Sequence, residues 1–210
     1  MKKTILLLVT FCLSLSAQAS LISNNDAGFG ANSITTDTDS SLDWLDLTFS
    51  KGFSYNQLVT ETSAGGIFDG FRLAMMGEVQ SLFGAASLPT TTTDITDLAT
   101  VNVLIDLIGA TRSQGSNLET LGVTGTAGGV GSHLGAGLDF FLANGAPMYR
   151  VGLGNISYGN TFSATTIGGW LVRDSLSVPE PPEILLFVTG ILGLFFARRK
   201  LKRGSSPVTS

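Results

Sequence analysis

Two strongly apolar segments, residues 5–15 and 184–197, lie close to the two ends of this 210-residue chain. The mean hydropathy of +0.33 is high for a domain in water, which makes these segments the strongest constraint on the fold. If residues 1–19 and 178–210 are set aside, the 158 residues of 20–177 remain. That length predicts one domain with a hydrophobic core of its own.

The first 19 residues have the three parts of a secretory signal peptide in the right order. Lys2 and Lys3 supply the positive start, an apolar stretch follows, and Ala17 and Ala19 form an A-x-A cleavage site. A buried first helix would not need this order. We therefore expect export across the inner membrane and a mature chain that begins at Ser20.

The single cysteine, Cys12, lies inside the predicted signal peptide. Phe11 precedes it where a lipoprotein signal needs a small residue, so we do not expect a lipid anchor. Once the signal is removed, the exported protein has no disulfide, no thiol nucleophile and no thiolate ligand. With His133 as the one histidine, a zinc site is also excluded, and we expect no cofactor.

The C-terminal apolar run, 184–197, is shorter than the roughly 20 residues of a usual transmembrane helix. We expect it to insert with the help of flanking residues, to leave the basic cluster in the cytoplasm and to hold the domain outside that membrane only transiently. The last residues, 204–210, are expected to be a disordered tail. The predicted sorting motif consists of Val178, Pro179, Glu180 and Pro181 before the helix and of Arg198 and Arg199 after it.

This pattern of a Pro-Glu-Pro motif, one hydrophobic helix and an Arg-rich end resembles the PEP-CTERM sorting signal of Gram-negative bacteria, here over 178–203. The resemblance implies an exosortase, a membrane-embedded processing enzyme, as a partner, in a bacterium that makes exopolysaccharide. It also implies a product that is released from the inner membrane to the cell surface or the extracellular matrix. Pro182 stands where this signal commonly has Ser or Thr, and the segment after the arginines, 200–210, is longer than usual. Both differences leave the efficiency of cleavage open.

The domain at 20–177 is predicted to be α+β, with two or three helices and an antiparallel sheet. Ser54 followed by Gln57 is a capping-box pattern, and Gly109 ends the most regular helical repeat. Fifteen glycines fall in 109–169, which we interpret as loops between short strands. The expected helices are 55–62, 75–83 and 96–108, and the expected strands are 42–48, 148–153 and 170–174.

Three blocks of the domain are similar to recurring blocks of PEP-CTERM proteins: 42–48, 70–83 and 169–173. Their order more remotely resembles bacterial domains related to the C-type-lectin-like fold. Met75 stands where that pattern commonly has Thr as a helix N-cap, so we expect this helix to begin without its own cap. The predicted core contains Trp44, Leu47, Phe71, Val79, Leu82, Val101, Ile105, Ile108, Val151 and Trp170.

The candidate calcium ligands are Asp37, Asp39 and Asp43, because extracellular calcium sites use several oxygen ligands. The EF-hand template fails here, since Leu42 occupies its Gly position and Thr48 its Glu position. Solvated acids at the entrance to a strand are the alternative interpretation, and we assign no metal.

No enzyme motif is found. Ser132 and His133 are neighbours in the sequence, but the chain has no Gly-x-Ser-x-Gly motif of the kind that presents a catalytic serine. We expect His133 to lie in a loop. The carboxylate pairs weighed for glycoside hydrolysis are Asp69 with Glu78 and Glu61 with Glu119; nothing fixes their separation. The interpretation is a non-enzymatic surface or matrix protein.

The alternative is a lectin-like module that binds exopolysaccharide through exposed aromatic rings. The aromatic side chains weighed for sugar stacking, against core packing, are Trp44, Tyr55, Phe71, Tyr149 and Trp170. Nucleic acid is excluded as a partner, because residues 20–177 hold five Lys and Arg against fourteen Asp and Glu. Arg72, inside an apolar block, is expected to be partly buried and to pair with Asp43, Asp46 or Glu78.

Overall fold

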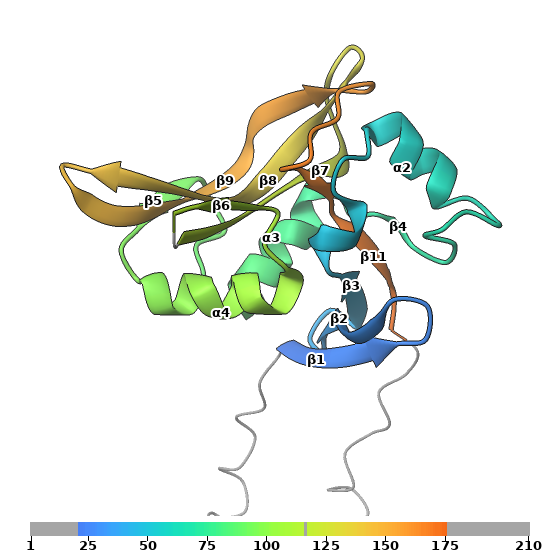
Figure 1. Ribbon diagram of the computed structural model, residues 1–210, viewed down its shortest axis with the longest axis horizontal. Coiled ribbons are helices and arrows are strands. Elements are labelled where there is room, and N and C mark those ends of the chain that lie inside the picture. The colour runs from blue at the N-terminus through green and yellow to red at the C-terminus, as the bar shows by residue number, and fades with distance from the viewer. Residues whose placement is uncertain (1–20, 116, 176–210) are drawn as a thin grey trace, which may run out of the picture. The chain divides into compact units, whose positions relative to one another are not determined.

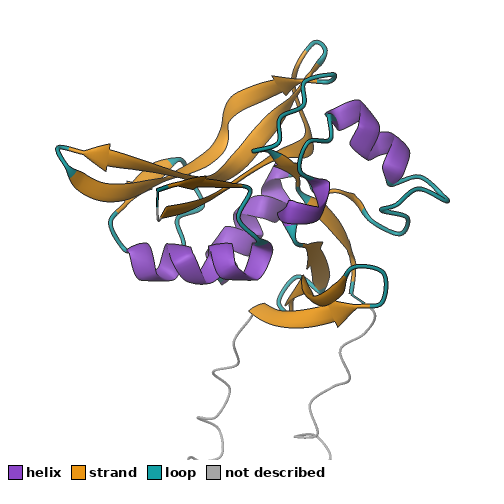
Figure 2. Cartoon of the chain, in the orientation of Figure 1, coloured by secondary structure: helices purple, strands orange, loops and turns teal. Residues whose placement is uncertain are grey.

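A computed structural model describes residues 21–115 and 117–175. The expectation of an α+β domain is confirmed: three α-helices and two mainly antiparallel sheets lie within this part of the chain (Figures 1 and 2). The predicted residues of signal cleavage and sorting lie outside the described residues; they are Ala17, Ala19, Ser20, Val178, Pro179, Glu180, Pro181, Arg198 and Arg199.

The first sheet joins the two ends of the described chain. Its last strand in sequence, β11, lies between β3 and β4, and every pairing is antiparallel. The order across the sheet is β1 (Leu21–Asp26), β2 (Gly30–Asp37), β3 (Leu42–Leu45), β11 (Leu171–Asp174) and β4 (Arg72–Leu73).

The second sheet is built on a long three-stranded meander, and its one parallel pairing is between β10 and β7. A sixth strand, β6 (Arg112–Gln114), also pairs with β7. The order of the other strands is β10 (Gly168–Gly169), β7 (Asn117–Gly129), β8 (Ser132–Ala143), β9 (Ala146–Gly159) and β5 (Thr93–Ile95).

The helices follow the predicted positions closely and differ mainly at their ends. Ser54 and Gln57 form the predicted capping box, in which each side chain binds the backbone N–H of the other residue. The third helix begins at Leu98, two residues later than expected, with Asp97 as its N-cap, and Gly109 ends it at a φ of 83°. The helices are η1 (a 3₁₀ turn, Leu47–Ser50), α2 (Tyr55–Glu61), α3 (Met76–Ala85) and α4 (Leu98–Ile108).

The main core lies between α3, α4 and one face of the second sheet, and all ten predicted core residues are buried. Leu138 and Val151 of that sheet pack in the same cluster as Val79 of α3 and Ile105 of α4. Figure 1 shows α4 along one face of the sheet. We call the opposite face of the second sheet the outer face.

The interpretation of 109–169 as loops between short strands is wrong, because most of this region forms the long strands β7, β8 and β9. Several of its glycines are needed where another chain segment comes close. A Cβ on Gly137 would lie 2.1 Å from the carbonyl oxygen of Thr120, and one on Gly122 would lie 2.8 Å from the Leu47 side chain. Gly131 and Gly145, with φ near 71° and 82°, form the turns of the meander.

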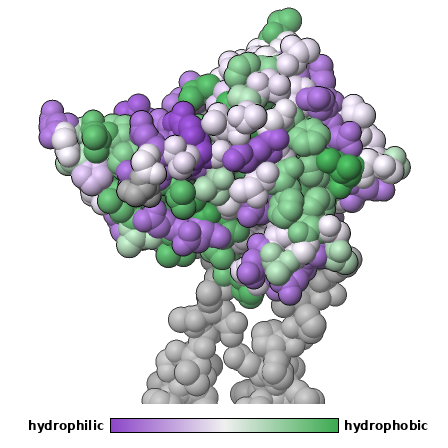
Figure 3. Space-filling view, viewed as in Figure 1, coloured by the Kyte–Doolittle hydropathy of each residue, from purple (hydrophilic) through white to green (hydrophobic). Residues whose placement is uncertain are grey.

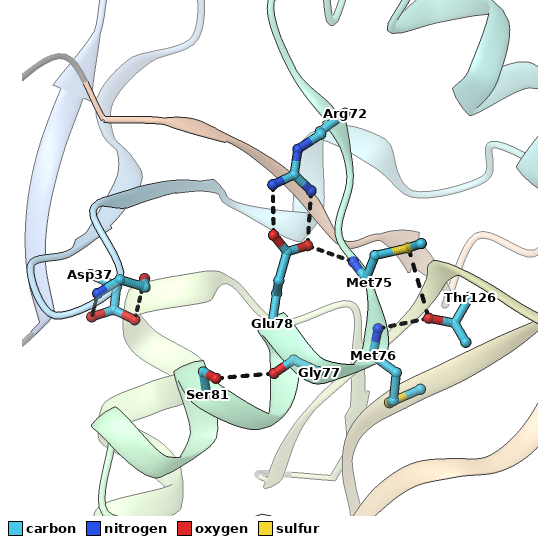
Figure 4. Close-up of polar contacts among 9 residues, drawn as sticks. Asp37, Arg72, Met75, Met76, Gly77, Glu78, Ser81 and Thr126 are labelled. Atoms are coloured by element: carbon cyan, nitrogen blue, oxygen red, sulfur yellow. Dashed lines mark hydrogen bonds and ion pairs between the residues drawn. The ribbon is translucent and has the colours of Figure 1, made fainter.

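The start of α3 lacks a capping oxygen at Met75, as expected, but another strand supplies it. Thr126 of β7 accepts a hydrogen bond from the Met76 N–H at 2.8 Å (Figure 4). Glu78 accepts one from the Met75 N–H at 2.7 Å. A tertiary contact thus satisfies the helix end that the local sequence leaves open.

Replacing Thr126 by valine keeps the shape of the side chain and removes this hydrogen bond. We expect T126V to lower the free energy of unfolding by about 1 kcal/mol, the usual effect of a lost N-cap. Chemical denaturation measures it. The control is S81A, whose hydroxyl binds the Gly77 carbonyl within the same helix and is exposed. Equal stabilities of T126V and wild type would contradict the role of Thr126.

Candidate functional site

A row of five charged side chains crosses the outer face. Arg112 lies opposite Glu119, Asp139 opposite Arg150, and Arg150 opposite Asp94. The register of β7 on β8, which places Thr120 opposite Leu138, puts Glu119 beside Asp139 and completes the row. Directly opposed residues of antiparallel strands point to the same face, so all five side chains belong to one surface.

Ion pairs connect this row. Arg112 binds Glu119 through Nε and Asp139 through Nη2, the latter at 2.8 Å. Arg150 binds Asp94 at 2.9 Å and lies over the ring of Phe141. Glu119 is fully buried, and its Oε1 has no hydrogen-bond partner within the described chain. Two guanidinium groups therefore meet three carboxylates, and each guanidinium already has an acidic partner.

A shallow depression lies beside this row, and glycines of β8 and β9 form its floor. Gly137 and Gly152 are directly opposite each other, and Gly135 lies two residues along β8. Its rim contains Asp139, Arg150, Asn155 and Tyr158. Because the glycines have no side chains, the side chains of Tyr158 and Asn155 can pack directly on the sheet. A Cβ on Gly135 would lie 2.4 Å from the Tyr158 ring, and one on Gly152 would lie 2.9 Å from the Asn155 amide oxygen.

Tyr158 is the central side chain of this region. Its ring stacks on Phe162 with a centroid distance of 5.6 Å and an interplanar angle of 11°. Burial, and then the negative charge of Asp139, raise the pKa of its hydroxyl above the ordinary value, and Arg112 opposes the shift. The phenol thus lies within electrostatic reach of the charged row.

A second depression, lined largely by aromatic and small side chains, shares Tyr158 with the first. Phe53, Tyr55, Phe162 and Ile167 contribute to it. Tyr55 stacks on His133 at a centroid distance of 3.4 Å, and His133 lies opposite Tyr158 in the register of β8 and β9. Two stacked aromatic pairs therefore lie side by side next to the glycine-floored depression.

The hydropathy of the molecular surface differs between its two halves (Figure 3). Hydrophilic side chains gather over the region of β5 and β6, and a hydrophobic area lies beside α2. Exposed apolar residues of that second region include Val59 and Ile67, with 44% and 57% of their surface accessible.

The three calcium candidates do not form one cluster. Asp37 accepts hydrogen bonds from the backbone of Asp39 and from the hydroxyl of Ser40, which closes the turn between β2 and β3. Asp43 accepts a hydrogen bond from Thr36 and pairs with Arg173. The alternative of solvated acids is wrong for Asp37 and Asp43, which are 1% and 8% exposed.

Within 21–115 and 117–175, no group of three or more His, Cys, Asp or Glu residues is arranged to hold a metal ion.

His133 lies in strand β8, so its predicted place in a loop is wrong. Its Nδ1 is 2.9 Å from the amide oxygen of Asn160, and no carboxylate orients the ring in this contact. The carboxylates weighed for glycoside hydrolysis have separate structural contacts. Glu61 accepts a hydrogen bond from the Ile67 N–H and Asp69 one from the Gly65 N–H.

The aromatic candidates for sugar stacking divide into core and surface. The buried ones, with at most 5% exposure, are Trp44, Phe71, Tyr149 and Trp170. Tyr55 is partly exposed and lies in the region described above. Sequence reasoning missed Tyr158 and Phe162, although their isolation within a Gly-, Asn- and Ser-rich stretch was a signal for surface aromatics.

Arg72 pairs with Glu78, one of the three partners expected for it. Two hydrogen bonds of 2.8 and 2.6 Å join the guanidinium to the carboxylate (Figure 4). The Arg72 side chain is 48% exposed, so about half of its surface is buried, as expected. The Arg72 hydrogen bonds hold the pKa of the Glu78 carboxyl below its ordinary value, against the opposing effect of burial.

Arg173 of β11 connects the first and the last described strands. It binds Asp26 at 2.8 Å and Asp43 at 3.4 Å and lies 4.6 Å from the centroid of Phe71. Burial acts to raise the pKa of Asp26, but the Gly28 N–H and Arg173 together hold it below its ordinary value.

Comparison of the chain with protein-family models, with curated proteins and with solved structures gives no match. Across the described residues, no helix has both the length and the apolar character needed to cross a bilayer.

The Arg72–Glu78 pair predicts a pH-dependent stability. Because the folded-state pKa of Glu78 is depressed, the pair stabilises the fold above the unfolded pKa, and this contribution is lost as the pH falls through the folded pKa. A double-mutant cycle of R72A and E78Q should give a coupling of about 0.2–1 kcal/mol at pH 7, the range for exposed ion pairs. The coupling should shrink below about pH 4; a pH-independent coupling would contradict this account.

Proposed function

We propose that this chain is an exported, non-enzymatic protein of the cell surface or extracellular matrix. A signal peptide at 1–19 carries it across the inner membrane. The segment at 178–203 holds it there transiently through the apolar run at 184–197, and an exosortase-type enzyme then sorts it. The observation that carries the proposal is the order of these parts in the sequence: a cleavable start, a domain, a Pro-Glu-Pro motif, an apolar run and a basic end.

All described helices and strands lie between the two proposed cleavage regions. Strand β1 begins at Leu21, one residue after the proposed mature N-terminus, and β11 ends at Asp174, four residues before Val178. Strand β11 pairs with β3 and β4, and Arg173 holds it to Asp26. Cleavage before Ser20 and near the Pro-Glu-Pro motif would therefore leave every described element in place.

Carbohydrate binding is the second candidate, and the depressions around Tyr158 favour it. They combine stacked aromatic rings with carboxylate, amide and guanidinium groups, which can contact the ring faces and the hydroxyls of a sugar. The remote resemblance to the C-type-lectin-like fold belongs to this candidate. It is supported by the order β3, α2, β4, α3 and the return of β11 between β3 and β4. That likeness concerns the fold and identifies no site.

The first proposal predicts the ends of the mature protein. In membrane and medium fractions of the native host, intact-mass spectrometry should find a chain that begins at Ser20 and ends near 179–182. Such a product means that both end segments are processed signals. A chain that retains 184–210 and remains in the membrane fraction would contradict processing and would make the apolar run a lasting anchor.

A further inference from the structure

We infer that the outer face binds a neutral polysaccharide, whose chain lies across Tyr158 and contacts both depressions. The inference rests on the carbohydrate-binding candidate proposed above, and it names the binding surface and the class of ligand. Three features of the surface carry it: the distribution of hydrogen-bonding groups, the pairing of charges and the position of the aromatic rings.

The glycine-floored depression offers hydrogen-bonding groups of the kinds that sugar hydroxyls need. Asp139 supplies acceptors, Arg150 supplies donors, and the exposed Asn155 supplies both. The side chains of Tyr158 and Asn155 lie over Gly135 and Gly152, so these two side chains form the surface that a sugar ring would meet. A flat polar ligand fits such a surface better than an apolar one.

The charges favour a neutral sugar over an acidic one. Arg112 is already paired with Glu119 and Asp139, and Arg150 with Asp94. The row of two arginines and three acids has a net charge of −1, and residues 20–177 as a whole have −9. A uronic acid or sulfated polymer would meet net repulsion on this face and would have to displace an existing carboxylate partner.

The aromatic rings extend the site beyond one sugar. Phe162 is 49% exposed and stacks on Tyr158, which belongs to both depressions. Aromatic rings with one accessible side provide large contact area at low entropic cost. A polymer that places one unit beside Asn155 and the next against Phe162 uses both depressions, whereas a monosaccharide uses one.

The test is isothermal titration of the protein as its host produces it. The probes are neutral oligosaccharides built from glucose, mannose or galactose, their monosaccharides, and an oligogalacturonate of the same length. The variants are N155A in the first depression and F162A beside the second. V103A is the control, because Val103 is 61% exposed on α4 and thus lies on the helix that covers the opposite face. All three sites are exposed, and unchanged thermal unfolding verifies that the variants are folded.

At least one neutral oligosaccharide should bind more tightly than its monosaccharide and more tightly than the oligogalacturonate. N155A and F162A should each weaken that binding about tenfold, the effect of one lost contact of about 1.4 kcal/mol, and V103A should not. Preference for the acidic probe overturns the ligand class. Neutral binding that neither variant weakens overturns the site and leaves carbohydrate binding standing. Absence of binding to every probe overturns both, while the mass of the mature protein still tests export and sorting separately.

Discussion

Trp170 joins the two sheets, and the rest of the domain depends on this contact. It lies between β10 of the second sheet and β11 of the first, and it is fully buried. Its backbone N–H binds the Val123 carbonyl, its carbonyl accepts a bond from Ala74, and its indole N–H donates to Ala136. Replacing a buried tryptophan by alanine costs about 3–5 kcal/mol, which is a large part of the about 5–15 kcal/mol that stabilises a typical domain.

The glycines before Trp170 make this joint possible. A Cβ on Gly168 would lie 2.6 Å from the Leu47 carbonyl oxygen, and one on Gly169 would lie 2.5 Å from the Leu58 side chain. Ser50 fills the remaining space, accepting a hydrogen bond from the Gly169 N–H at 2.8 Å. Because η1 and α2 approach the strand so closely, any side chain at position 168 or 169 would push them away from it.

The helices and the core can be predicted from the sequence, because patterns of neighbouring residues determine them. The Ser54 capping box, Gly109 at the end of α4 and the apolar spacing of that helix are short-range patterns. The predicted core residues follow from such patterns. The long strands β7 to β9 are not predictable in this way. In the sequence alone, their glycines are typical of loops. The close approach of Thr120, Leu47 or Tyr158 to these positions explains why the strands contain glycine. Thr126, which caps α3 from 50 residues away, is equally nonlocal.

Less of the candidate site than of the fold can be predicted from the sequence, because the pairing register of the strands brings its residues together. Arg112, Glu119, Asp139 and Arg150 are dispersed over the sequence and become neighbours only once β6 to β9 pair. The aromatic residues that stand out in the sequence, Trp44 and Trp170, are packed edge to face in the core. The surface pair, Tyr158 and Phe162, is formed by a strand end and the loop that follows it.

The central claim is that the outer face around Tyr158 binds a neutral polysaccharide, and hydrogen–deuterium exchange tests it most directly. The mature protein would be measured with and without neutral oligosaccharides built from glucose, mannose or galactose. The account predicts slower exchange in β8, β9 and residues 159–167, with α3 and α4 unchanged. Protection confined to the helices, or no change anywhere, would contradict it.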